Sequence, residues 1–144
     1  MRFLCLYRPA AGENGPPPRA EDFARMGAFI EDMVKTGALL ATDGLAPSAQ
    51  GARVRVTGGE FTVMDGPFTE TKELIASYAM IQAKSRQEAV ELTRRFLECV
   101  GGDGEVEVRQ VFEPTDFPAE TFTPGEQDRE RKWREEMARQ ASHA

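Results

Sequence analysis

The sequence predicts an α+β domain in which strands and helices alternate, followed by a separate helical arm. Three observations support this class. The spacing of apolar residues changes repeatedly between the period of two of strands and the period near 3.6 of helices. Two alternating runs flank Gly58-Gly59, as in a β-hairpin. Serine or threonine followed three residues later by glutamate, a helix-start signal, occurs twice in the second half of the chain.

The first third of the chain predicts a strand, a helix and a second strand. Residues 2–8 are a short apolar run that ends at a proline, as expected for a strand. The loop 10–18, rich in glycine and proline, leads to a helix from about Glu21 to Gly37. The apolar stripe of this helix consists of Phe23, Met26, Ile30, Met33 and Val34. Residues 38–45 predict the second strand.

A β-hairpin and a central strand are predicted next. In residues 53–65, apolar and polar side chains alternate on both sides of Gly58-Gly59, which supplies the positive φ angles of a tight turn. This alternation predicts a hairpin with one half-buried face. Residues 74–83 are apolar enough for a strand inside a sheet.

The last part of the domain predicts another helix and strand. Ser85 and Glu88 form a capping box, so a helix begins there. Its apolar stripe consists of Ala89, Leu92, Phe96, Cys99 and Val100, and Gly101-Gly102 ends it. Residues 105–112 alternate with period two and predict the final strand.

We place the domain at residues 1–113 and a C-terminal extension at 114–144, where prolines become frequent and apolar residues few. Thr123 and Glu126 form a second capping box, with proline at the first helical position. A charged helix is therefore expected at about 124–141.

The apolar stripe of this charged helix is narrow, consisting of Trp133, Met137 and Ala141. Such a stripe does not hold a free helix together. We expect an arm that lies on the domain or on a neighbouring subunit, or else a solvated tail that frays.

Without the hairpin, the elements follow the order β-α-β, β-α-β, which is the split ferredoxin-like arrangement. Two helices would then cover one face of a four-stranded sheet and leave the other face open. Strands that are apolar on both faces need a cover there as well. A second copy related by a two-fold axis is the simplest source of that cover, so we expect a homodimer.

Composition argues against nucleic-acid and membrane partners. The net charge of −6 and the absence of a dense basic run disfavour contact with phosphate backbones. The apolar stretches are far shorter than the ~20 residues of a membrane-spanning helix. The apolar run at the N-terminus is interrupted at Arg8-Pro9, too early for a signal peptide, so we expect a cytoplasmic protein.

The sequence contains no pattern that predicts a metal or a cofactor. Cys5 and Cys99 are far apart and lie among apolar residues, where free cysteines behave as core residues. The chain has one histidine, His143, next to its C-terminus, which leaves metal and serine-hydrolase chemistry without a ligand or a base in the domain.

Residues 65–78, DGPFTETKELIASY, resemble the signature block of the DGPF-type, YCII-related proteins. The order of elements on either side of this block, from MRFLCLYR to EVEVRQVF, also matches that family, and VFEPTDFP followed by a charged helix resembles its longer members. The resemblance implies a ferredoxin-like fold of the dimeric α/β-barrel type. It implies no particular reaction, since none is established family-wide. Genes of this family often neighbour those of extracytoplasmic-function sigma factors.

Two residues depart from the family pattern. Ser77 stands where relatives usually carry glycine, which puts a close backbone approach at that strand in doubt. Relatives proposed as enzymes rely on a His–Asp pair, whereas the only histidine here is His143. We therefore do not assign the acid/base role of that His–Asp pair to any residue of this domain.

The DGPF loop (65–73) is open to two interpretations. Turn chemistry explains its residue types without a ligand, because Asp-Gly-Pro fixes a tight turn. Alternatively, a loop that enters a central strand is a common position for binding groups. Lys72 would then hold an anion, and Asp65 or Glu73 would act as a base only if buried. The candidate ligand-binding residues are Asp65, Thr69, Lys72, Glu73, Tyr78, Tyr7 and Arg8.

Three functions remain open at this point. The first is a dimeric module that binds a small polar or anionic ligand beside the DGPF loop. The second is a cofactor-independent enzyme of the isomerase or oxygenase type, by analogy of fold alone. The third is a protein-interaction module, linked to sigma-factor regulation, in which Trp133 and Met137 contact the partner.

Overall fold

The computed structural model describes residues 1–143, which divide into two compact units. The first unit spans Met1–Val111, and the second begins at Phe112. Antiparallel strands and two long helices make up the first unit, and the C-terminal helix belongs to the second. The mixed α/β class predicted from the sequence is therefore confirmed.

A four-stranded antiparallel sheet forms the centre of the first unit, in the order β2-β5-β1-β6. Its members are β1 (Arg2–Pro9), β2 (Leu39–Gly44), β5 (Ser77–Gln82) and β6 (Gly104–Gln110). This is the split β-α-β order expected once the hairpin is set aside. The strand predicted at 74–83 begins only at Ser77, and a short 3-10 turn, η3 (Thr71–Glu73), precedes it.

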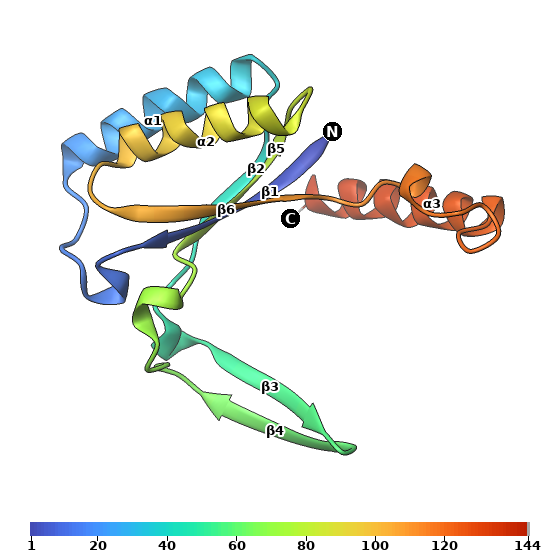
Figure 1. Ribbon diagram of the computed structural model, residues 1–144, viewed down its shortest axis with the longest axis horizontal. Helices are drawn as coiled ribbons and strands as arrows, with labels where there is room; N and C mark the ends of the chain where they lie inside the picture. The colour runs from blue at the N-terminus through green and yellow to red at the C-terminus, as the bar shows by residue number, and fades with distance from the viewer. Residues whose placement is uncertain (144) are drawn as a thin grey trace. The chain divides into compact units, whose positions relative to one another are not determined.

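The helices α1 (Ala20–Lys35) and α2 (Arg86–Val100) lie side by side over one face of this sheet (Figure 1). Successive side chains of a strand point to opposite faces. Odd-numbered residues of β1 therefore face the helices, and even-numbered residues face the other side. The buried core between the sheet and the helices is small and consists of Phe3, Cys5, Met33, Ile81, Ala83 and Ala89.

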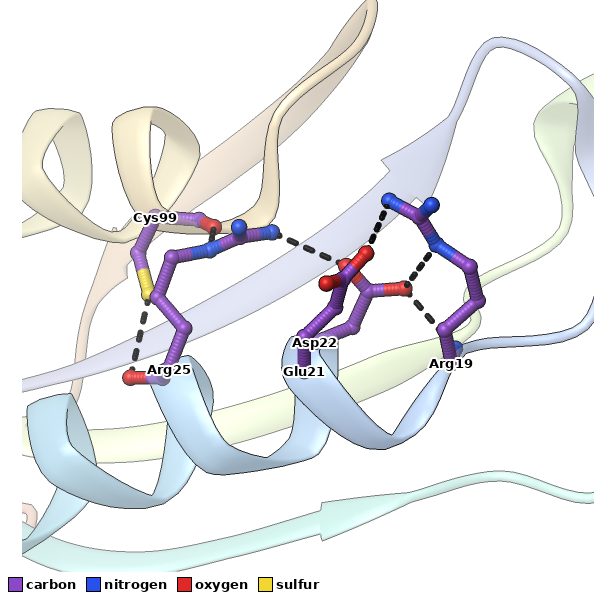
Figure 2. Close-up of polar contacts among 5 residues, drawn as sticks. All are labelled: Arg19, Glu21, Asp22, Arg25 and Cys99. Carbon is purple, nitrogen blue, oxygen red and sulfur yellow. Dashed lines mark hydrogen bonds and ion pairs between the residues drawn. The ribbon is translucent and has the colours of Figure 1, made fainter.

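Arg25 joins α1 to the end of α2 (Figure 2). Its Nε donates to the carbonyl oxygen of Cys99 at 2.7 Å, which satisfies one of the last carbonyls of α2. Its Nη2 donates to Asp22 at 3.1 Å, and Asp22 accepts the backbone N–H of Arg19 at 2.8 Å. That backbone hydrogen bond, together with the two nearby guanidinium groups, lowers the pKa of the Asp22 carboxyl.

The start of α2 departs from the predicted capping box in one bond. The Ser85 hydroxyl accepts the backbone N–H of Glu88 at 3.1 Å, as expected. The Glu88 carboxylate, however, accepts the backbone N–H of Lys84 at 2.6 Å, one residue earlier than the box would place it. The helix still begins where the sequence predicts, because the serine cap is in place.

The hairpin consists of β3 (Ala52–Thr57) and β4 (Glu60–Asp65), which form a separate two-stranded sheet. Gly58 and Gly59 have φ angles of 57° and 83°, as the predicted turn requires. The expectation of a half-buried face is wrong, since every residue of both strands is exposed. The hairpin extends away from the helices, on the opposite side of the main sheet (Figure 1), so its apolar face does not join the core.

The second unit contains α3 (Pro124–Ala141), which begins at the predicted cap. The Thr123 hydroxyl accepts the backbone N–H of Glu126 at 3.3 Å. Ion pairs between residues three or four apart run along α3, among them Asp128–Lys132, Glu130–Arg134 and Arg131–Glu135. Within residues 1–143, no helix is long and apolar enough to span a membrane.

Gly66 provides a test of how the hairpin is attached to the domain. A Cβ atom at this position would overlap with the backbone carbonyl of Ser48. We expect Gly66→Ala to lower the free energy of unfolding by about 1–3 kcal/mol or more, as overpacking does. Urea unfolding followed by circular dichroism measures this.

Gly27→Ala is the matched control, because nothing lies within 4 Å of a Cβ there and the residue sits inside α1. It should leave stability unchanged or raise it by about 0.5–1 kcal/mol. Equal stability of the Gly66→Ala variant and the wild type would show that the hairpin base does not pack as described.

Candidate functional site

Three loops meet at the base of the hairpin, and Ser48 lies at their centre. This serine, in the short turn η2 (Ser48–Gln50), is buried. Its hydroxyl donates to the Glu13 carboxylate at 2.8 Å and accepts the backbone N–H of Phe68 at 3.1 Å. The backbone N–H of Ser48 also donates to Glu13. We call this arrangement of Glu13, Ser48 and Phe68 the loop joint.

The DGPF loop contributes structure to the loop joint. The guanidinium of Arg53 lies 4.0 Å from the centre of the Phe68 ring, in a cation–π contact. Gly66 approaches the backbone of Ser48 so closely that only glycine fits. The turn-forming interpretation therefore accounts for the Gly-Pro-Phe part of this loop.

The predicted ligand-binding side chains of the loop point into solvent. Asp65, Thr69, Lys72 and Glu73 are all exposed. Within residues 1–143, none of these four side chains makes a hydrogen bond or an ion pair. Arg8 reaches the loop through the backbone, since its Nε donates to the carbonyl oxygen of Glu73 at 3.2 Å.

The two tyrosines proposed for the same site lie on opposite faces of the sheet. Tyr7 faces the helices, where its ring packs edge-on against Phe96 with centroids 5.2 Å apart. Tyr78 faces the open side and donates its hydroxyl to Asp43 at 2.6 Å. Burial raises the pKa of Tyr7, whereas the hydrogen bond to the Asp43 carboxylate raises that of Tyr78. The seven predicted residues therefore do not converge on one place.

A cavity of about 70 Å³ lies between the sheet and the two helices of the first unit. Its helical wall is apolar and includes Met26, Phe29, Ile30, Met33, Leu92 and Phe96. Its floor is the helix-facing side of the sheet, including Cys5, Tyr7, Ser77 and Ala79. No Asp, Glu, Lys, Arg or His side chain lines this cavity in the described part of the chain.

Two residues with hydroxyl groups, one from each central strand, line this floor. Tyr7 and Ser77 are directly opposite each other on β1 and β5. Neither hydroxyl has a hydrogen-bond partner among residues 1–143. By contrast, the hydroxyls of Thr42 and Thr93 already donate to backbone carbonyls, at 2.9 and 2.8 Å.

The sequence analysis did not predict that Tyr7 and Ser77 lie on the same face, although the alternation of each strand indicates which face each residue occupies. Tyr7 is in phase with Phe3 and Cys5 on one strand, and Ser77 is in phase with Ile81 on the other. Period two therefore assigns each hydroxyl to the core face. Their pairing depends on the register between strands that are 70 residues apart in sequence, which no local pattern specifies.

Both cysteines are free, as expected. Burial raises the pKa of the Cys5 thiol, which keeps it protonated and unreactive. The Cys99 thiol lies 3.6 Å from the carbonyl oxygen of Arg25. The part of the chain that the structure describes has no group of three His, Cys, Asp or Glu residues arranged to hold a metal ion.

Two comparisons with known proteins bear on this chain. The profile of the YCII-related domain family matches residues 1–115. An uncharacterized protein of Rhizobium meliloti (strain 1021) is 34% identical over 96 residues, which cover 65% of this chain and 77% of that protein. The family match includes the main sheet, α1, α2 and the hairpin, and it ends before α3.

Glu13 tests the loop joint directly. Glu13→Gln keeps the side-chain shape but replaces one acceptor oxygen by an N–H₂ group, so one Ser48 donor loses its acceptor. We expect a loss of about 1–3 kcal/mol in the free energy of unfolding. Glu31→Gln, at an exposed position of α1, serves as the control and should change stability little. Equal effects of the two changes would contradict the role of Glu13.

Proposed function

The chain belongs to the YCII-related domain family, and from that premise we propose that it binds a small, uncharged, mainly apolar molecule between its sheet and α1 and α2. One observation carries this proposal. Tyr7 and Ser77, whose hydroxyls have no partner among the described residues, both line the floor of an otherwise mainly apolar cavity. Binding sites of this kind combine an apolar wall with a few polar groups that orient the ligand.

The cavity limits the size and charge of the ligand. Its volume of about 70 Å³ corresponds to roughly five to seven water-sized spheres, enough for a small organic molecule. An ion inside it would lose its hydration without gaining a charged partner, which costs several kcal/mol. The ligand we propose is therefore neutral.

The two hydroxyls indicate where the polar end of the ligand would lie. A phenol with a raised pKa stays protonated at neutral pH, so Tyr7 is a hydrogen-bond donor there. The Ser77 hydroxyl both donates and accepts. A carbonyl or hydroxyl group of the ligand would bond to one of these hydroxyls, while the remainder packs against Phe29 and Phe96.

This proposal differs from a polar or anionic ligand at the DGPF loop. The side chains of Asp65, Lys72 and Glu73 are exposed, so an anion bound there would stay in water and be held weakly. The proposal also favours binding over catalysis. Isomerase or oxygenase chemistry without a cofactor needs a buried base, and the described lining of the cavity holds no carboxylate or histidine.

Two conservative substitutions test the cavity. Tyr7→Phe and Ser77→Ala each remove one hydroxyl, and the one that removes the partner of the ligand should weaken binding about tenfold, which is ~1.4 kcal/mol. The probes are small neutral alcohols, ketones and phenols, screened by thermal shift. A compound at 100 times its Kd stabilises the wild type by about 2.7 kcal/mol.

The control is Tyr78→Phe, which removes a hydroxyl from the opposite face of the sheet. It should leave the affinity of any compound found in the screen unchanged. The cavity assignment fails if no neutral compound stabilises the wild type, or if Tyr78→Phe weakens binding as much as the more damaging of the two cavity substitutions does.

The exposed side chains of α3 support a second candidate function, the binding of a protein partner. Trp133 and Met137, one turn apart on this helix, have exposed fractions of 48% and 51%. Tryptophan is among the residues that contribute most to binding at protein interfaces. We propose that this stripe contacts a protein partner. Genes of the family often neighbour those of extracytoplasmic-function sigma factors, so a sigma factor of this class is the first partner to examine.

The paired substitution Trp133→Ala/Met137→Ala tests that contact. It should weaken binding of such a sigma factor at least tenfold in a quantitative pull-down. Glu135→Ala, on the opposite side of α3, should change binding little, and deletion of residues 115–144 should abolish it while ligand binding in the cavity persists. Full binding by the double variant would exclude this stripe as the contact.

A further inference from the structure

The seam between α1 and α2 lies over the cavity. Phe29 of α1 and Phe96 of α2 both line the cavity, and their ring centroids are 6.5 Å apart. On the other side, the floor consists of strands joined by backbone hydrogen bonds, which bar passage through the sheet. A small molecule can therefore reach the cavity between the helices, once the two rings move apart.

Two side-chain contacts join the helices along this seam. At one end, Nε of Arg25 donates to the carbonyl oxygen of Cys99 at 2.7 Å (Figure 2). Farther along, Nη2 of Arg95 on α2 donates to the carboxylate of Asp32 on α1 at 2.9 Å. In both helices, the two phenylalanines that line the cavity fall between these contacts in sequence.

Arg95 also lies against Phe29. Its guanidinium carbon is 5.5 Å from the centre of the Phe29 ring, in a cation–π contact. The lining of the cavity does not include Arg95, and 44% of its side chain is exposed. The Phe29 ring is therefore in contact with the cavity on one side and with a solvent-exposed guanidinium, bound by Asp32, on another.

We propose that Arg95 and Asp32 form a strap over Phe29 that controls the passage of a small neutral molecule between α1 and α2. When the ion pair separates, the guanidinium leaves the Phe29 ring, which then rotates away from Phe96. Exposed side chains change rotamer within nanoseconds, so the strap opens without unfolding of either helix. Arg95 is a positioning residue, because it acts through Phe29.

The strap is weak enough to open often. Both partners of the ion pair are exposed, at 44% for Arg95 and 56% for Asp32. Loss of an exposed ion pair and of a cation–π contact together should raise the population of the open state roughly threefold to tenfold. The strap therefore sets how fast a ligand enters and leaves, whereas the cavity wall sets how tightly the ligand is held.

The first experiment measures access to the cavity without a ligand. Cys5 lines the floor and is buried, so its thiol reacts with an external reagent when the cavity opens. Cys99→Ser leaves Cys5 as the single cysteine and keeps the backbone carbonyl that Arg25 binds. In this parent protein, the probe is methyl methanethiolsulfonate, a small neutral reagent, and mass spectrometry measures the rate of labelling.

Arg95→Met should be labelled roughly threefold to tenfold faster than the parent. Asp32→Asn should have an intermediate rate, because Arg95 can still cover Phe29. Arg94→Met is the matched control, since both ion pairs of Arg94, with Glu91 and Glu98, stay within α2. It should be labelled at the rate of the parent. Equal rates for Arg95→Met and Arg94→Met would overturn the proposal.

The same rates in dilute urea separate opening of the strap from unfolding of the domain. Unfolding exposes much surface and therefore responds steeply to urea, whereas rotation of a few side chains exposes little. The additional labelling of Arg95→Met should not change with urea at low concentrations. An increase as steep as that of global unfolding would mean that the substitution destabilises the domain, and the strap would be rejected.

The second experiment rests on the proposed function, because it needs a neutral compound that binds in the cavity. For a compound found by thermal shift, Arg95→Met should raise the association and dissociation rates by the same factor. The Kd should not change, since the strap closes equally over the empty and the filled cavity. A weaker Kd with an unchanged association rate would contradict a role in passage. If no compound binds, the proposed function fails, and the labelling of Cys5 still decides whether the strap exists.

Discussion

The alternation of side chains across the four-stranded sheet is the constraint on which the rest of the structure depends. Because successive residues face opposite sides, β1 contributes Cys5 and Tyr7 to the interior and Leu4 and Leu6 to the open side. The same rule on β5 separates Ser77 from Tyr78. Two surfaces with different chemistry thus arise from two short strands. The interior is mainly apolar and includes Tyr7 and Ser77, whereas on the open side Leu6 lies opposite Glu107.

A second constraint acts at the base of the hairpin, where a buried hydroxyl is satisfied from two directions. Ser48 donates to Glu13 and accepts from Phe68, so each of the three loops depends on the other two. Such a network is costly to leave half-made, because a buried polar group without a partner is destabilising. The Gly-Pro-Phe part of the DGPF loop is explained by this joint. The charged side chains of Asp65, Lys72 and Glu73 make no hydrogen bond or ion pair within residues 1–143.

Features encoded within a few residues were predictable from the sequence, whereas features that depend on tertiary pairing were not. The turn at Gly58-Gly59 and the caps at Ser85 and Thr123 lie where local rules place them. An exposed hairpin face and a half-buried one have the same alternation of apolar and polar residues, so the sequence pattern could not show that this face is exposed. The Tyr7–Ser77 pair required the register between distant strands, and the contact of Glu13 with Ser48 joins loops that are 35 residues apart.

The ion pairs of α3 make the folding of this helix depend on ionic strength. Asp128 accepts hydrogen bonds from Lys132 and Arg131, which lower its pKa, and Arg131 also pairs with Glu135. Exposed pairs of this kind weaken as salt shortens the Debye length, from about 10 Å at 0.1 M to about 3 Å at 1 M. Rising salt therefore loosens the C-terminal helix while apolar burial in the sheet and helix core persists. The ionic composition of the surrounding solution would then set how much of α3 is folded at any moment.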